Sequence, residues 1–131
     1  MYRNDYMSNT PLHFEHHWGK SVHIDLMGCE HDRLTSVPLL ESFIAEVIKK
    51  IGMKAHGPCH IERFGSPEDN LEGYSAMQFI ETSSITVHLD EILNRAYIDI
   101  FSCKNFAEQE AFDFSKEYFK AQEGKLTVLD R

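Results

Sequence analysis

The chain of 131 residues has little of what several protein classes require. Its three cysteines, Cys29, Cys59 and Cys103, are too few for the disulfide framework of a small secreted domain. No stretch approaches the roughly 18 consecutive apolar residues of a transmembrane helix. Residues 1–18 also lack the apolar run of a secretion signal. We therefore expect a cytoplasmic protein that does not cross a membrane.

Basic residues are scarce as well. Lysine and arginine number 13 against 21 aspartates and glutamates, so the formal net charge is −8. A chain of this charge repels phosphate backbones and anionic lipid surfaces, which argues against nucleic acid or a membrane as a partner. The hydrophobic fraction of 42% is ample for one core at this length. We expect residues 1–18 to form an extension and residues 19–131 to form one domain.

Two segments have helical periodicity. Apolar side chains recur at spacings of three and four through residues 38–51, which predicts an amphipathic helix with Ser36 as its N-cap. A second helix is expected to begin near Asn105, with Glu108 completing a capping box.

About five segments instead alternate apolar and polar residues, as strands with one buried face do. They are residues 21–27, 55–64, 75–80, 85–89 and 96–102. The polar residues 81–84 read as a tight connection between two of them. These elements predict an α+β two-layer sandwich, an antiparallel sheet with two main helices on one face.

The most specific pattern is Ser83-Ser84-Ile85-Thr86-Val87-His88, followed by Tyr97-Ile98-Asp99-Ile100-Phe101-Ser102-Cys103. Ser75 lies eight residues before Ser83, and Gly19-Lys20 and His23-Ile24-Asp25-Leu26-Met27-Gly28-Cys29 lie upstream. Serines at a turn by themselves are ordinary turn formers. In this order and spacing, the segments resemble the short prokaryotic class of S-adenosylmethionine decarboxylase. That family consists of proenzymes that cleave themselves and convert an internal serine into a pyruvoyl group.

The resemblance implies a role for each matched residue. Ser83 is the expected pyruvoyl precursor, with self-cleavage between Thr82 and Ser83. Ser75 and His88 are expected to assist processing, and Cys103 to act as the catalytic acid. The residue types suit these roles, because imidazole is a base near neutral pH and a thiol can return a proton to carbon.

The resemblance also implies a substrate and an assembly. Phe64 is expected to stack on the adenine of S-adenosylmethionine, and Glu91 is the residue available to hold the ribose. The product would be the aminopropyl donor for spermidine synthesis, and the active form would be a homodimer. No metal ion is expected, because His13, His16, His17, Cys59 and His60 lack the spacing of a structural zinc site.

Three departures from the family pattern keep alternatives open. Thr82 stands where glutamate is usual, and Ser84 replaces a histidine, which leaves cleavage at the neighbouring peptide possible. Asp90-Glu91-Ile92 replaces an aromatic-Pro-Glu sequence. One alternative is the same chemistry on another amino acid, arginine or ornithine. Another is an unprocessed, non-catalytic relative that acts by binding.

Overall fold

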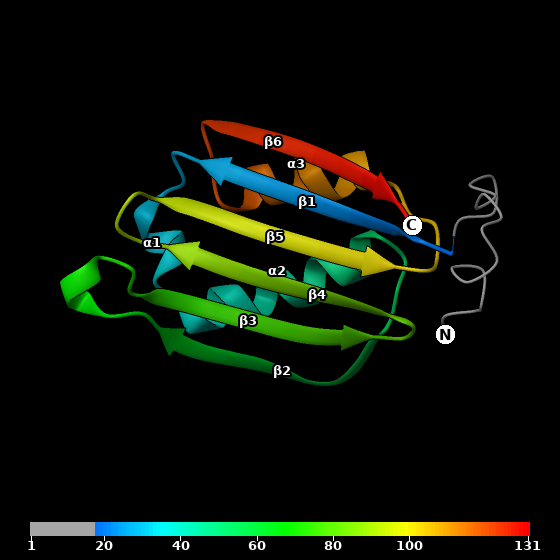
Figure 1. Cartoon of the computed structure of the whole chain (residues 1–131), viewed down its shortest axis with the longest axis horizontal. Coiled ribbons are helices and arrows are strands. Elements are labelled where there is room, and N and C mark those ends of the chain that lie inside the picture. The colour runs from blue at the N-terminus through cyan, green and yellow to red at the C-terminus, as the bar shows by residue number, and fades with distance from the viewer. Residues whose placement is uncertain (1–17) are drawn as a thin grey trace, which may run out of the picture.

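The computed structural model describes residues 18–131 as one six-stranded antiparallel sheet with helices on one face (Figure 1). In chain order the elements are β1 (Lys20–Met27), α1 (His31–Leu34), α2 (Val37–Lys50), β2 (Ala55–Phe64), the 3-10 helix η2 (Pro67–Asp69), β3 (Gly73–Ile80), β4 (Ser83–Asp90), β5 (Arg95–Ser102), α3 (Glu108–Tyr118) and β6 (Glu123–Asp130). The expected α+β two-layer sandwich is confirmed. The expected extension lies, apart from Trp18, outside the described residues.

The strands lie in the order β2-β3-β4-β5-β1-β6, and each neighbouring pair is antiparallel. Ser83 at the start of β4 therefore pairs with Ser102 at the end of β5, whereas His88 near the end of β4 pairs with Ser75 in β3. We call the two ends of the central strands, across which these pairs lie, the Ser83 end and the His88 end of the sheet. Figure 1 shows them on opposite sides, with the β3–β4 turn at the Ser83 end.

The core lies between the sheet and the helices. Alternate residues of the central strands face the helices and are fully buried, among them Ile24, Val87 and Ile98. From α2, Phe43 packs on Phe119 with ring centroids 4.8 Å apart. Each such side chain contributes about 1.5–3 kcal/mol on burial, so this layer holds the sheet in place.

The other face of the sheet, here called the open face, carries no described helix (Figure 1). Large apolar side chains lie on it, and Met77 and Phe79 are 48% and 56% exposed. Trp18 is 59% exposed and stacks on Phe101, with ring centroids 5.5 Å apart. An apolar sheet face of this kind usually packs against a second layer.

The first predicted helix is confirmed as α2, since the Ser36 hydroxyl accepts a hydrogen bond from the Leu39 amide at 3.2 Å. The predicted capping box of α3 is wrong. Ala107 is the N-cap residue, and neither Asn105 nor Glu108 caps the helix with its side chain. Both side chains instead accept hydrogen bonds from Lys20 Nζ, because burying that ammonium group requires partners.

The sixth strand, β6, was not predicted. Its sequence EGKLTVLD pairs only with β1, at the edge of the sheet, and most of its residues are exposed. An edge strand has one neighbouring strand and little burial, so apolar and polar residues alternate less regularly along it than along a central strand. The connection predicted at residues 81–84 is also shorter than expected, because Ser83 and Ser84 already belong to β4.

Candidate active site

Ser83 begins β4 and is half-buried. Alternation along the strand turns its side chain to the same side as Ile85 and Val87, toward the helices. The Ser83 hydroxyl donates a hydrogen bond to Ser102 Oγ at 2.7 Å. Ser102 was not among the predicted site residues. A signal for it exists in the sequence, since it is a serine at an inward position of a strand whose other inward residues are apolar.

The residue before Ser83, Thr82, has a strained backbone conformation. Thr82 has a φ of 60°, in the left-handed region, and its hydroxyl donates to the carbonyl oxygen of Glu81 at 2.5 Å. A β-branched residue in this region is an outlier that costs on the order of 1–3 kcal/mol. The bond predicted to be cut therefore follows a backbone conformation that the fold imposes on threonine.

Cys103 follows β5 directly and is half-buried. It lines a pocket of about 170 Å³ together with Trp18, Gly19, Lys20, Ser102, Lys104, Asn105 and Asp130. Lys20 Nζ reaches under the following loop and donates to the Phe106 carbonyl at 2.5 Å and to Glu108 at 2.6 Å. The hydrogen bond from Lys20 lowers the pKa of Glu108 below its ordinary value. The loop that carries Cys103 is thereby fastened to β1.

Ser75 and His88 lie together on the open face. Ser75 Oγ and His88 Nδ1 are 2.8 Å apart, and the imidazole is exposed. His88 lies five positions after Ser83 in β4, a span of about 16 Å at the usual rise per strand residue. Their side chains also leave the strand on opposite faces. Within one chain, His88 does not reach the Ser83 hydroxyl.

The two predicted substrate-binding residues lie at the His88 end. Phe64 ends β2 and is 55% exposed. Glu91 follows β4, and its carboxylate pairs with Arg63 at 2.8 Å. Arg63 also contacts Glu72 at 3.3 Å, and the hydrogen bond with Glu72, followed by that with Glu91, raises the pKa of Arg63. The predicted site residues thus form two groups, which we name the Ser83 group (Thr82, Ser83, Cys103) and the His88 group (Ser75, His88, Phe64, Glu91).

A further hydrogen-bonded chain of residues lies on the open face. Ser21 Oγ is 3.0 Å from His23 Nε2, and His23 Nδ1 is 2.8 Å from Asp99 Oδ1. The order of groups is that of a nucleophilic triad, but Ser21 is only 8% exposed. A substrate does not reach a hydroxyl buried in this way, and the network ties β1 to β5.

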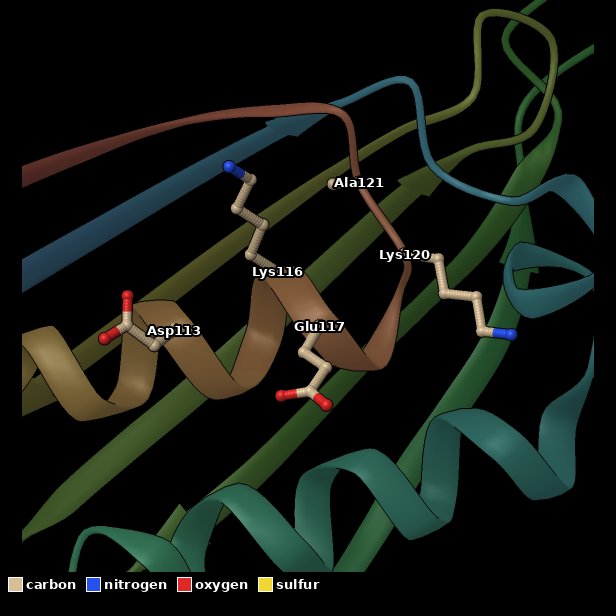
Figure 2. Close-up of a pocket in the computed structure, with 5 residues that line it drawn as sticks. All are labelled: Asp113, Lys116, Glu117, Lys120 and Ala121. Carbon is tan, nitrogen blue, oxygen red and sulfur yellow. The ribbon is translucent and has the colours of Figure 1, made fainter.

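A second, shallow hollow of about 420 Å³ lies on the surface of α3 (Figure 2). It is lined by Asp113, Lys116, Glu117, Lys120 and Ala121, and Figure 2 shows the two lysine side chains pointing to different sides of the helix. Its lining contains no thiol, hydroxyl or imidazole group, so it lacks the groups that the predicted chemistry needs.

Within residues 18–131, no group of three or more histidine, cysteine, aspartate or glutamate side chains is arranged to hold a metal ion. No helix in the same range is long and apolar enough to cross a membrane. Three of the histidines considered for a zinc site, His13, His16 and His17, lie outside the described residues.

Comparisons with known proteins agree with the resemblance found in the sequence. The family model of S-adenosylmethionine decarboxylase matches residues 20–131. The S-adenosylmethionine decarboxylase proenzyme of Geobacillus kaustophilus is 25% identical over 113 residues, 86% of each chain. That of Methanococcus maripaludis is 26% identical over 113 residues, also 86% of each. That of Caldicellulosiruptor saccharolyticus is 24% identical over 117 residues, 88% of this chain and 90% of the relative.

A solved structure has the same fold. The crystal structure of the adenosylmethionine decarboxylase from Aquifex aeolicus superimposes with a TM-score of 0.74, covering 88% of this chain and 91% of that one. The two sequences are 17% identical. The similarity confirms the two-layer architecture that the alternation and helical periodicity predict.

Proposed function

Because this chain belongs to the S-adenosylmethionine decarboxylase family, we propose that it removes carbon dioxide from S-adenosylmethionine after converting its own Ser83 into a pyruvoyl group. Family membership makes the protein a carboxy-lyase. The observation that carries the proposal is the strained Thr82 immediately before a serine whose hydroxyl is held in a hydrogen bond. The product would serve as aminopropyl donor for spermidine synthesis. The free cysteines fit the expected cytoplasmic location.

Self-cleavage would begin at the Ser83 hydroxyl. Its oxygen attacks the Thr82 carbonyl carbon, the peptide C–N bond breaks, and the Ser83 nitrogen takes up the hydroxyl proton. A base then removes the Ser83 α-proton, the Cβ–Oγ bond breaks, and Thr82 leaves with a free carboxylate. The dehydroalanine that remains takes up a proton at Cβ and becomes an imine, and water hydrolyses the imine to the ketone and releases ammonia. Strain at Thr82 favours the first step because opening the peptide relieves it.

The residues around Ser83 suit the group that this reaction makes. A pyruvoyl ketone supplies an electrophile that takes up the electron pair released with carbon dioxide. Cys103 follows Ser102, the cross-strand partner of Ser83, and its thiol is available to return a proton to the α-carbon. Cys103 and Ser102 both line the pocket at this end of the sheet.

A second copy of the chain would complete the site. The basic group proposed for processing, His88, lies at the other end of the sheet and on its other face. The open face carries exposed apolar side chains such as Met77 and Phe79. Packing two open faces about a two-fold axis that runs across the strands would cover this surface and bring the His88 group of each copy to the Ser83 end of the other. The imidazole would then approach β4 from the side opposite the Ser83 hydroxyl, so it would act on the Ser83 α-proton. We therefore propose a homodimer with two shared sites.

On the substrate side, the exposed ring of Phe64 supports stacking on adenine, and the net charge of −8 favours a cationic sulfonium ligand. Removing the ring with Phe64→Ala should weaken substrate binding by about 1–3 kcal/mol, the range for a base stacked on an aromatic side chain.

One observation favours a second candidate substrate. The Glu91 carboxylate, expected to hold the ribose, is paired with Arg63 and is therefore partly occupied. A basic amino acid, arginine or ornithine, has no ribose and does not need this residue. The same self-made cofactor and the same Ser83 group would serve it.

Intact mass spectrometry of the purified protein tests the proposal. Cleavage between Thr82 and Ser83 should give fragments of residues 1–82 and 83–131, and Ser83→Ala should remain whole. Carbon dioxide release from S-adenosylmethionine, arginine and ornithine is then compared under one set of conditions. A single full-length mass after prolonged incubation would support a non-catalytic binding role, and a fragment beginning at Ser84 would move the cofactor by one residue. Turnover of a basic amino acid alone would favour the second candidate.

A further inference from the structure

Ser102 is a fully buried serine at the end of a strand whose other inward residues are apolar. It is 0% exposed, whereas Ala96, Ile98 and Ile100 fill the other inward positions of β5. It is the cross-strand partner of Ser83, and the two hydroxyl oxygens are 2.7 Å apart. We propose that Ser102 is a positioning residue that holds the Ser83 hydroxyl for attack on the Thr82 carbonyl. This inference rests on the self-cleavage proposed above.

The hydrogen bonds of Ser102 assign a direction to the Ser83 hydroxyl. A serine hydroxyl donates once and accepts at two lone pairs. Ser102 Oγ donates to the Lys104 carbonyl at 2.9 Å and accepts from the Lys104 amide at 2.9 Å. Met53 Sδ lies 3.8 Å away, and sulfur is a weaker acceptor than that carbonyl. The remaining lone pair of Ser102 Oγ accepts the hydrogen bond from the Ser83 hydroxyl, which leaves both lone pairs of Ser83 Oγ available for nucleophilic attack.

The backbone around Ser102 is held from a second side. A Cβ added to Gly19 would lie 2.8 Å from Cys103 Cα and in conflict with the Ser102 carbonyl, so β1 approaches this segment too closely for any side chain. Lys20 fastens the loop beyond Lys104 through Asn105 and the Phe106 carbonyl. Ser102 therefore offers its lone pair from a fixed position.

This arrangement makes Ser102 an orienting group and not the base. Ser102 keeps its own proton, which is hydrogen-bonded to the Lys104 carbonyl, while the Ser83 proton passes to the Ser83 nitrogen as the peptide C–N bond breaks. Without Ser102 Oγ, the Ser83 hydroxyl would rotate among staggered positions or turn to other acceptors. Losing one such hydrogen bond should slow the acyl shift about ten- to a hundredfold.

The test compares two substitutions of the same shape. Ser102→Thr keeps the hydroxyl, and Ser102→Val replaces it with a methyl group of similar volume. Ser115→Ala is the matched control, because Ser115 is also 0% exposed and its hydroxyl is bonded only within α3, to the Ala111 carbonyl. Cleavage is followed by intact mass, with and without hydroxylamine, which captures the ester intermediate as a Thr82 hydroxamate and so reports on the first step.

We expect Ser102→Thr and Ser115→Ala to cleave at the rate of the unsubstituted protein. Ser102→Val should cleave ten- to a hundredfold more slowly in both conditions while keeping a folded circular dichroism spectrum. If the valine variant does not fold, Ser102→Ala takes its place. Equal cleavage rates for Ser102→Thr and Ser102→Val, or for Ser102→Ala and the unsubstituted protein, would overturn the role proposed for Ser102. The proposed self-cleavage at Ser83 would be unaffected by that result. An unsubstituted protein that stays whole even in hydroxylamine would overturn the proposed function and this inference with it.

Discussion

At the scale of single residues, the three thiols lie in different surroundings. Cys29 is 5% exposed, and burial raises its pKa to about 11. Burial, with a smaller contribution from Glu41, also raises the pKa of the Cys59 thiol. Cys103 is half-buried beside the pocket at the Ser83 end. Cys29 is thus a core thiol, whereas Cys59 and Cys103 are both half-buried, and Cys103 alone of the three lies beside that pocket.

This difference predicts the order of alkylation. A thiol with a pKa near 11 is ionised at about one part in a thousand at pH 8, and only the thiolate reacts. Iodoacetamide at pH 8 should therefore modify Cys103 and leave Cys29 unmodified until the pH approaches 11 or the protein is unfolded. Peptide mass mapping after timed labelling measures this order. Labelling of Cys29 as fast as Cys103 in the folded protein at pH 8 would contradict it.

The strain at Thr82 gives a second prediction at this scale. Asparagine adopts the left-handed region more readily than a β-branched residue. In a Ser83→Ala background, which keeps the chain whole, Thr82→Asn should raise the free energy of unfolding by about 1 kcal/mol. With Ser83 present, the same substitution should slow self-cleavage, because less strain is released. Urea denaturation and intact mass measure the two effects, and a lower stability would show that Thr82 is not strained.

At the scale of elements, the carboxylate of Asp90 stabilises the turn between β4 and β5. Asp90 Oδ1 accepts from the amides of Ile92 and Leu93 at 3.1 and 3.2 Å, and Oδ2 accepts from Arg95 at 2.9 and 2.7 Å. Partial burial acts to raise the pKa of Asp90. The hydrogen bonds from Arg95 and the two amides outweigh it, so the pKa of Asp90 is lowered. This hairpin fixes the register that aligns Ser83 with Ser102.

Asp90→Asn tests this role in the Ser83→Ala background. Replacing the carboxylate should cost about 1–2 kcal/mol of stability at pH 7, because bonds to a charged acceptor are stronger than neutral ones. A lowered folded pKa contributes stability above the unfolded carboxyl pKa of about 4, and this is lost as the pH falls through the folded value. Urea denaturation at pH 7 and at pH 2–3 should show the difference between the variants shrinking on acidification. An equal difference at both values would contradict the assignment.

At the scale of the whole molecule, the separation of the two groups predicts complementation between copies. Ser83→Ala retains His88, and His88→Ala retains Ser83, so neither variant should cleave alone. In a mixed dimer, the His88→Ala chain should cleave at its own Ser83 with the imidazole of the other copy. Mixing the variants and following intact mass measures this, with the double variant Ser83→Ala/His88→Ala as the partner in the control. Cleavage of His88→Ala alone would show that His88 is not needed for processing, and an uncleaved mixture would contradict a site shared between copies.

The open face should carry the dimer contact. Sedimentation at micromolar concentration is expected to give twice the monomer mass for the unsubstituted protein. Phe79→Glu places a charge on this face at a side chain that is 56% exposed, so it should shift the protein to monomer without unfolding it. The monomer should also fail to cleave. A Phe79→Glu protein that remains a dimer would move the contact to the sheet edges.

Local patterning by itself determined most of the secondary structure and the matched residues. Periods of two and of three to four are properties of neighbouring residues, so α2 and five of the six strands could be located from the sequence. The spacing of Ser75, Ser83, His88 and Cys103 likewise needed no structure to be recognised. The edge strand β6 was missed because one neighbour and little burial impose little alternation on a sequence.

Only the tertiary structure decided which of those residues meet. Antiparallel pairing places Ser102, nineteen residues along the chain, against the Ser83 hydroxyl, and it carries His88 to the other end and face of the same strand. Lys20 and Glu108, 88 residues apart, meet below the loop after Cys103 and replace the predicted capping box. Such contacts depend on register and on the cost of burying a charge or a hydroxyl without a partner. Both are set by the whole sheet and its helices, and neither is encoded in any short segment.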